Sequence, residues 1–202
     1  MSIVLRSSPF SPFGRKVKLA MMHLGQFSGI EVVNTDTMNA DDPIRSQNPL
    51  GKIPALILED GMVVYDSRVI LEWVDIRAGG GVIIPAEPKK RIEALTLQAL
   101  ADGIMDAGIL QRYEVMFHSE DRRDEKWLTH QRDKVARALK TLEAAPPAVE
   151  VHVGTITLAC ALAYQDFRFE GKWRAGHPRL VAWLDAFAAL MPEAWAETTP
   201  VI

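Results

Sequence analysis

Two short segments, Ser11-Pro12-Phe13-Gly14-Arg15 and Gly51-Lys52-Ile53-Pro54, decide how this chain of 202 residues is expected to fold. Serine followed by proline is typical of a helix start, because serine caps free backbone N–H groups and proline fits the first helical position. Proline at the start of a strand is tolerated because it need not donate to the ladder. The first segment therefore predicts a helix that begins after Ser11, and the second predicts a strand from Pro54. Ser8-Pro9 is a competing cap for the same helix.

The residues around these two segments alternate between strand and helix patterns. Short apolar runs predict strands at residues 3–5, 30–34, 54–59 and 62–65, the last two joined by a hairpin signal at Asp60-Gly61. Apolar stripes predict helices after Ser11 and after Ser67, and a short helix after Asp41-Asp42-Pro43. The order strand-helix-strand-helix-strand-strand-helix predicts a compact α/β unit with a mixed sheet.

Beyond this unit the chain shows only helical periodicity. Glycine and proline runs at residues 78–81 and 85–88 interrupt the pattern. Helical stripes then cover residues 89–118, 128–142 and 180–190, and residues 158–167 are apolar nearly all round, as expected for a buried central helix. We therefore expect a first domain at residues 1–78, a linker at 79–88 and an all-helical domain at 89–202.

The bulk composition excludes several classes of function. A formal net charge of −3 gives no electrostatic reason to expect nucleic acid or an anionic membrane as a partner. No apolar run is long enough to span a bilayer, and the first residues lack the apolar core of a signal peptide. The single cysteine, Cys160, fits a reducing compartment, so we expect a cytoplasmic protein. The five histidines show no metal-ligand spacing, so no metal site is expected.

The helix end at Ser11 suits a bound sulfur anion. Its free N–H groups, its positive dipole end and the serine hydroxyl all favour a thiolate over a thiol, and Arg15 would add positive potential. An unperturbed cysteine thiol titrates near 8.5, and lowering its pKa by about two units, near 2.7 kcal/mol, would leave it mostly ionised at neutral pH. The alternative is that Ser11 only caps a helix.

Two further pairs suit the rest of a peptide that carries such a thiol. A cis bond at Ile53-Pro54 would turn the Ile53 backbone outward to pair with an extended peptide, and an ordinary trans proline is the alternative. Ser67 as a cap would leave N–H groups for a carboxylate, and Asp66 beside it would meet an ammonium. A free α-amino acid end carries both charges; the alternative is a plain cap after an exposed aspartate.

Four segments of the chain, in this order, resemble the glutathione transferase superfamily, and the resemblance covers nearly the whole sequence. They are Ser11 to Val17, Asn48 to Pro54, Tyr65 to Ile70 and Thr155-Ile156-Thr157-Leu158-Ala159. The resemblance implies an α/β thioredoxin-like N-terminal domain of βαβαββα order followed by an all-helical C-terminal domain. The first tyrosine is Tyr65, which excludes the tyrosine-dependent classes, and serine at position 11 argues against the cysteine-bearing classes. The chain looks most like the bacterial, serine-type cytosolic members.

The resemblance also implies roles for individual residues. Ser11 would stabilise the thiolate of glutathione, the co-substrate. The other residues implied at the glutathione site are Phe13, Lys52 near the glycyl carboxylate, Ile53 and cis Pro54 at the cysteinyl part, and Asp66 and Ser67 at the γ-glutamyl end. Further candidates at the site are Arg15, Asp102, Asp106 and Tyr113; Asp102 and Asp106 are otherwise surface acids. An apolar pocket for the second substrate would use Phe10, Phe13, Met105, Tyr113 and Met116, which core packing explains equally well.

The expected activity is conjugation of glutathione to an apolar, small-molecule electrophile by a homodimer. Two alternatives stay open: a protein that keeps the fold but serves binding or interaction, and an enzyme that uses the same thiolate for peroxide reduction or dehalogenation. One feature departs from the family, whose central helix usually opens with Ser or Thr followed three residues later by Asp. Here Cys160 follows Thr157, so one capping bond is expected to be lost. Cys160 itself is expected to be inert packing.

Overall fold

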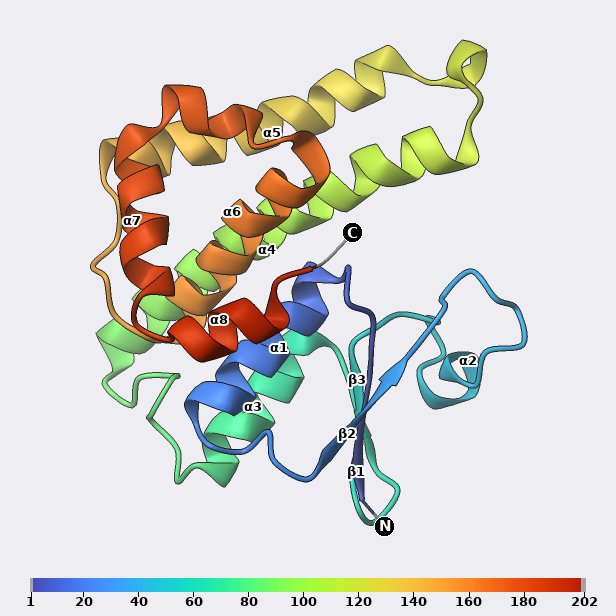
Figure 1. Ribbon diagram of the computed structural model, residues 1–202, viewed down its shortest axis with the longest axis vertical. Coiled ribbons are helices and arrows are strands. Elements are labelled where there is room, and N and C mark those ends of the chain that lie inside the picture. The colour runs from blue at the N-terminus through green and yellow to red at the C-terminus, as the bar shows by residue number, and fades with distance from the viewer. Residues whose placement is uncertain (1, 201–202) are drawn as a thin grey trace. The chain divides into compact units, whose positions relative to one another are not determined.

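The computed structural model describes residues 2–200 (Figure 1). By packing, these residues divide into two compact units. Residues 2–92 and 191–200 form the first unit, and residues 93–190 form the second. The first unit is thus completed by a segment from the far end of the chain. The division into domains at residues 1–78 and 89–202 stays a prediction.

The first unit is built on a mixed sheet of four strands. The strands are β1 (Ile3–Ser7), β2 (Ile30–Asn34), β3 (Ala55–Ile57) and β4 (Val63–Val64), in the order β2-β1-β3-β4. β1 pairs with β2 in parallel, while β3 runs antiparallel to both β1 and β4. The predicted hairpin at Asp60-Gly61 joins β3 to β4, and Gly61 takes the positive φ of +87° that such a turn requires. The predicted α/β class and mixed sheet are therefore confirmed.

Helices α1 (Pro12–His23) and α3 (Ser67–Arg77) cover one face of this sheet, and the short α2 (Ile44–Gln47) lies on its other side (Figure 1). Apolar side chains of α1, α3 and the sheet form the core of the unit, with Leu5, Val17, Met21, Leu56 and Ile70 buried among them. After α3, the chain stays tied to it: both carboxylate oxygens of Asp75 accept backbone N–H groups of the loop at residues 81–84, at 2.7–3.2 Å.

One helix of this unit has no counterpart in the sequence-based prediction. Helix α8 (Pro192–Thr198) packs against α1, and the two helices lie side by side in Figure 1. It has only seven residues, too few for a periodic stripe to stand out.

The second unit is all helical, as predicted. It contains most of α4 (Pro88–Phe117), together with α5 (Glu125–Ala144), α6 (Val153–Phe169) and α7 (Pro178–Ala188), and two short 3₁₀ turns, η1 (Glu120–Arg122) and η2 (Lys172–Gly176). Helix α6 is buried over most of its length, in agreement with its apolar sequence. Glycines let α4 and α6 approach closely: Gly154 meets α4 near Ala94, and Gly108 meets α6 near Tyr164. Residues near the start of α4 meet the start of α6, and residues further along α4 meet residues further along α6, so the two helices run parallel.

The start of α6 corrects one prediction. The helix begins at Val153, earlier than the predicted start near Thr157, and its N-cap is His152. The His152 Nδ1 atom accepts the N–H groups of Gly154 and Thr155 at 3.1 and 3.4 Å. In return, the Thr155 hydroxyl accepts the His152 N–H at 3.0 Å. A complete capping box therefore exists, and the expected loss of one bond at Thr157 is wrong; Thr157 instead donates its hydroxyl to the Val153 carbonyl.

Candidate functional site

The sheet topology gathers three of the predicted site segments at one end of the strands. In the strand register, Arg6 at the end of β1 faces Ala55 at the start of β3, and Leu56 faces Val64 at the end of β4. The segments that follow β1, precede β3 and follow β4 therefore leave the sheet at the same end of its strands. These segments carry Ser11, then Lys52, Ile53 and Pro54, then Asp66 and Ser67.

Ser11 is the N-cap of α1, as its sequence predicts. Its Oγ atom accepts the N–H of Gly14 at 3.1 Å, and its carbonyl accepts the N–H of Arg15 at 2.9 Å. The side chain is only partly buried. Because the oxygen is already an acceptor within the helix, the hydroxyl proton is available for donation to a group beyond the helix end. The competing cap, Ser8, lies in the preceding turn, where its hydroxyl accepts the Phe10 N–H.

Ile53 precedes a cis peptide bond to the buried Pro54, in agreement with the resemblance. Within residues 2–200, neither the N–H nor the C=O of Ile53 makes a hydrogen bond. An extended backbone can satisfy both groups by pairing with them as an added strand. The end of the sheet where β3 begins therefore offers a backbone docking position at Ile53.

Asn48 holds the loop that leads to Ile53, a role that sequence reasoning missed. Its side chain is buried, and the Nδ2 group donates to the Lys52 carbonyl at 2.9 Å. Its Oδ1 atom accepts the Leu50 N–H at 3.0 Å. The family resemblance covers Asn48 but predicted no separate role for it, although an asparagine that bonds the backbone two residues on is a known turn signal. The Lys52 side chain is exposed.

At the third segment the structure corrects the predicted cap. Asp66, not Ser67, is the N-cap of α3, and its Oδ1 atom accepts the Arg68 N–H at 2.9 Å. Ser67 is the first residue of the helix and is buried, while Asp66 is exposed and follows a second cis bond, Tyr65-Asp66. The sequence contains two adjacent residues that can cap a helix, and Asp66 is the one that caps α3. The exposed carboxylate and the helix N-terminus still lie next to each other.

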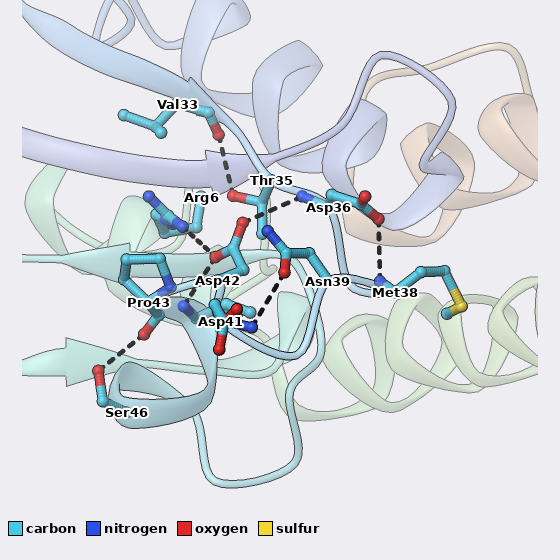
Figure 2. Close-up of polar contacts among 11 residues, drawn as sticks. Arg6, Val33, Thr35, Asp36, Met38, Asn39, Asp41, Asp42, Pro43 and Ser46 are labelled. Atoms are coloured by element: carbon cyan, nitrogen blue, oxygen red, sulfur yellow. Dashed lines mark hydrogen bonds and ion pairs between the residues drawn. The ribbon is translucent and has the colours of Figure 1, made fainter.

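A carboxylate in the loop before α2 ties that loop to the sheet. Figure 2 shows Asp42 between the side chain of Arg6 on β1 and the backbone of its own loop. Asp42 pairs with Arg6 and accepts the N–H groups of Ile44 at 2.9 Å and Asp36 at 3.2 Å. The Ile44 hydrogen bond is the main cause that lowers the pKa of Asp42, and the Asp36 bond and the Arg6 charge act in the same direction. The carboxylate thus fixes the segment that continues through α2 to Asn48.

Two other candidates lie on the first turns of α1. Phe13 is half-buried, and the Nζ atom of the fully buried Lys16 lies 5.5 Å from its ring centroid. Arg15 is buried, and its guanidinium lies 4.1 Å from the centroid of the Trp195 ring on α8. The Arg15 side chain is therefore engaged with the last helix of the chain.

The remaining candidates belong to α4, in the second unit. Asp102 and Asp106 lie one turn apart, as predicted, but Asp102 is fully buried, so its interpretation as a surface acid is wrong; Asp106 is exposed. Tyr113 is 41% exposed, and its ring meets that of Phe117 edge-on at 5.6 Å. Cys160 is buried within α6.

Among the apolar candidates for a second-substrate pocket, Met105 is fully buried, whereas Phe10 and Met116 are about half exposed. Within residues 2–200, no cluster of three or more His, Cys, Asp or Glu side chains has the arrangement of a metal site. In the same residues, no helix is long and apolar enough to cross a membrane.

Comparison with known proteins decides the family. The family model of the glutathione S-transferase N-terminal domain matches residues 10–77. The uncharacterised GST-like protein YibF of Escherichia coli K12 is 32% identical over 197 residues, which cover 94% of this chain and 95% of that protein. The chain belongs to the glutathione transferase family.

Solved structures of other glutathione transferases resemble the whole chain. A family member from Pseudomonas fluorescens Pf-5, with bound glutathione, is 40% identical with a TM-score of 0.90, and the match covers 100% of both chains. A glutathione transferase from Methylobacterium radiotolerans, in complex with glutathione sulfonate, is 28% identical with a TM-score of 0.89 over 100% of this chain and 96% of that one. The thioredoxin-like domain followed by a helical domain is therefore the fold of this transferase.

Proposed function

We propose that this glutathione transferase binds glutathione at one end of its sheet, ionises the bound thiol at Ser11 and conjugates it to an apolar electrophile. The observation that carries the proposal is the Ser11 hydroxyl. Its oxygen accepts the Gly14 N–H, and no hydrogen bond within residues 2–200 uses its proton, which can be donated at the N-terminal end of α1. Glutathione bound to the relative from Pseudomonas fluorescens supports the choice of thiol.

In the proposed mechanism Ser11 acts as a hydrogen-bond donor. A donor and a positive helix end both stabilise the charged form of a bound thiol, so they lower its pKa. A shift of about two units from the ordinary value near 8.5 leaves most of the bound thiol ionised at neutral pH. The thiol proton passes to solvent. The thiolate then attacks the electrophilic carbon of an aryl halide, a carbon–sulfur bond forms, and halide leaves with the electron pair. No covalent enzyme intermediate is needed.

The other groups at this end of the sheet would hold the peptide in place. The Ile53 backbone, which has no partner within residues 2–200, would pair with the cysteinyl part beside Pro54. The exposed Asp66 carboxylate would meet the γ-glutamyl ammonium, and the N–H groups at the start of α3, at Ser67, would meet its carboxylate. Lys52 would approach the glycyl carboxylate, and Phe13 would pack beside the sulfur. Asp102, Asp106 and Tyr113, on α4 of the second unit, stay sequence-based predictions.

We also propose that the transferase works as a homodimer. Helix α3 exposes Val69 at 51% and Ile76 at 65% of their surfaces. Residues seven apart lie on one helical face, and unpaired apolar faces of this kind are typical of interfaces between proteins.

The test of the Ser11 role compares two variants with the wild type. Ser11→Ala removes the donor, so kcat with a generic aryl halide should fall by about a hundredfold, as when other enzymes lose one charge-stabilising donor. The KM for glutathione should change far less, because backbone and charge contacts hold the peptide. Ser11→Thr keeps a hydroxyl and a capping oxygen and should retain most of the activity. Unchanged turnover in Ser11→Ala would remove Ser11 from the mechanism.

Calorimetry with glutathione separates the proposal from its rivals. Absence of binding at millimolar glutathione would favour a protein that keeps the fold for interaction only. Binding without turnover of aryl halides, but with turnover of hydroperoxides, would favour peroxide reduction by the same thiolate.

A further inference from the structure

The C-terminal helix α8 is fastened to the turn of α1 that presents Ser11. The Arg15 side chain donates to the hydroxyls of Thr198 and Thr199, at 3.3 and 2.9 Å, and to the Trp195 carbonyl at 3.3 Å. Its guanidinium also lies over the Trp195 ring. A cation at the C-terminal end of a helix is favourable, because the last carbonyl groups carry partial negative charge. Arg15 is 5% exposed, and its bond to Thr198 is buried.

The backbone of Arg15 belongs to the turn that holds the Ser11 cap. The Arg15 N–H donates to the Ser11 carbonyl, and the neighbouring Gly14 N–H donates to the Ser11 hydroxyl oxygen. The opposite side of this turn rests on β1: a Cβ atom built at Gly14 would lie 2.1 Å from the Ser7 Oγ atom. The turn is therefore held by the sheet on one side and by α8 on the other.

We infer that Arg15 is a positioning residue and that α8 acts as a brace for the catalytic turn. This inference rests on the proposed role of Ser11. With the brace in place, the Ser11 hydroxyl keeps the direction needed to meet the sulfur. Without it, the first turn of α1 opens more often, and the hydroxyl is misplaced in part of the population. Arg15 thus acts through the turn and through α8 rather than by contact with glutathione.

Two variants weaken the brace without changing Ser11. The double variant Thr198→Val/Thr199→Val removes two acceptors of Arg15 and keeps the side chains close in shape. Arg15→Leu removes the cation itself. Arg77→Leu is a matched control, because Arg77 also lies over a tryptophan, Trp73, at 5.2 Å, in the same unit but on α3. All three variants are compared with the wild type by amide hydrogen exchange and by kinetics with glutathione and an aryl halide.

We expect exchange of the Gly14 and Arg15 amides to become about tenfold faster in both brace variants and to stay unchanged in Arg77→Leu. The kcat should fall by roughly tenfold, since a small misplacement of a reacting group is costly, while the KM for glutathione stays within about twofold. Wild-type exchange rates at these amides in both brace variants would overturn the inference. Faster exchange with unchanged kcat would overturn the positioning role. A wild-type protein without turnover would instead refute the proposed function, and the exchange rates would still decide whether α8 braces the turn.

Discussion

Gly154 is a residue at which α6 lies very close to α4. A Cβ atom built there would lie 2.5 Å from the Ala94 carbonyl oxygen and 2.9 Å from the Leu97 Cβ atom. Neither atom is the end of a flexible side chain, so the helices would have to move apart.

We predict that Gly154→Ala lowers the free energy of unfolding by about 1–3 kcal/mol, the usual cost of overpacking a core. Gly103→Ala is the control, because a Cβ atom there meets nothing within 4 Å. Alanine is favoured over glycine in a helix, so the control should gain up to about 1 kcal/mol. Urea unfolding measures both, and equal stability of the two variants would contradict this account of the helix contact.

The sequence predicted where helices are capped better than it predicted which residue provides each cap. At α1 two Ser-Pro pairs compete, and Ser11, followed by Pro12 at the first helical position, is the cap. At α3 two adjacent residues are suitable, and Asp66 is the one that caps the helix. At α6 the cap is His152, which is not among the usual capping residues.

The cap of α6 makes the stability of this element depend on pH. Burial lowers the pKa of His152, although the Glu150 carboxylate, 3.7 Å from Nε2, acts in the opposite direction. Since the folded pKa lies below the unfolded value near 6.5, the unfolded chain takes up protons first as the pH falls. The contribution of the neutral cap is complete above pH 6.5 and is lost as the pH falls from there to the folded pKa.

His152→Asn should remove this dependence, because asparagine caps helices and does not titrate. We predict similar stability of variant and wild type at about pH 7.5, and a more stable variant at about pH 5. His152→Ala should lose about 1 kcal/mol at the higher pH, because the cap is gone. Urea unfolding at the two pH values provides the measurement. Parallel pH curves for wild type and His152→Asn would show that His152 does not titrate in this range.

Among the elements, the strands and long helices were predictable because each has its own apolar period. Helix α8 was not predictable from its own seven residues. It is held by contacts with Arg15, which lies more than 180 positions earlier in the chain. The loop after α3 was predicted as a linker from its glycines, but Asp75 binds four of its backbone N–H groups. Side-chain bonds of this kind leave no periodic signal in a sequence.

At the scale of the whole molecule, the order of elements was enough to predict a mixed sheet followed by helices. The return of residues 191–200 to the first unit depends on packing between the two ends of the chain, so it could not be predicted from local patterns. The same holds for the proposed dimer face, since exposure of Val69 and Ile76 is known only from the fold.

We predict that the wild-type protein sediments as a dimer at micromolar concentration. Val69→Glu/Ile76→Glu should sediment as a folded monomer, because the two charges would be buried without partners in the interface. Val149→Glu is the control, since Val149 is 42% exposed in a loop of the second unit. A monomeric wild type would refute the dimer, and a dimeric double variant would place the interface on another face.

Titration of the bound glutathione thiol by its ultraviolet absorbance shows directly whether Ser11 stabilises the thiolate. In the wild-type complex, the pKa of the bound thiol should lie about two units below the ordinary value near 8.5. In Ser11→Ala it should return most of the way to that value, and in Ser11→Thr it should remain low. An equally low pKa of the bound thiol in Ser11→Ala and in the wild type would contradict the account.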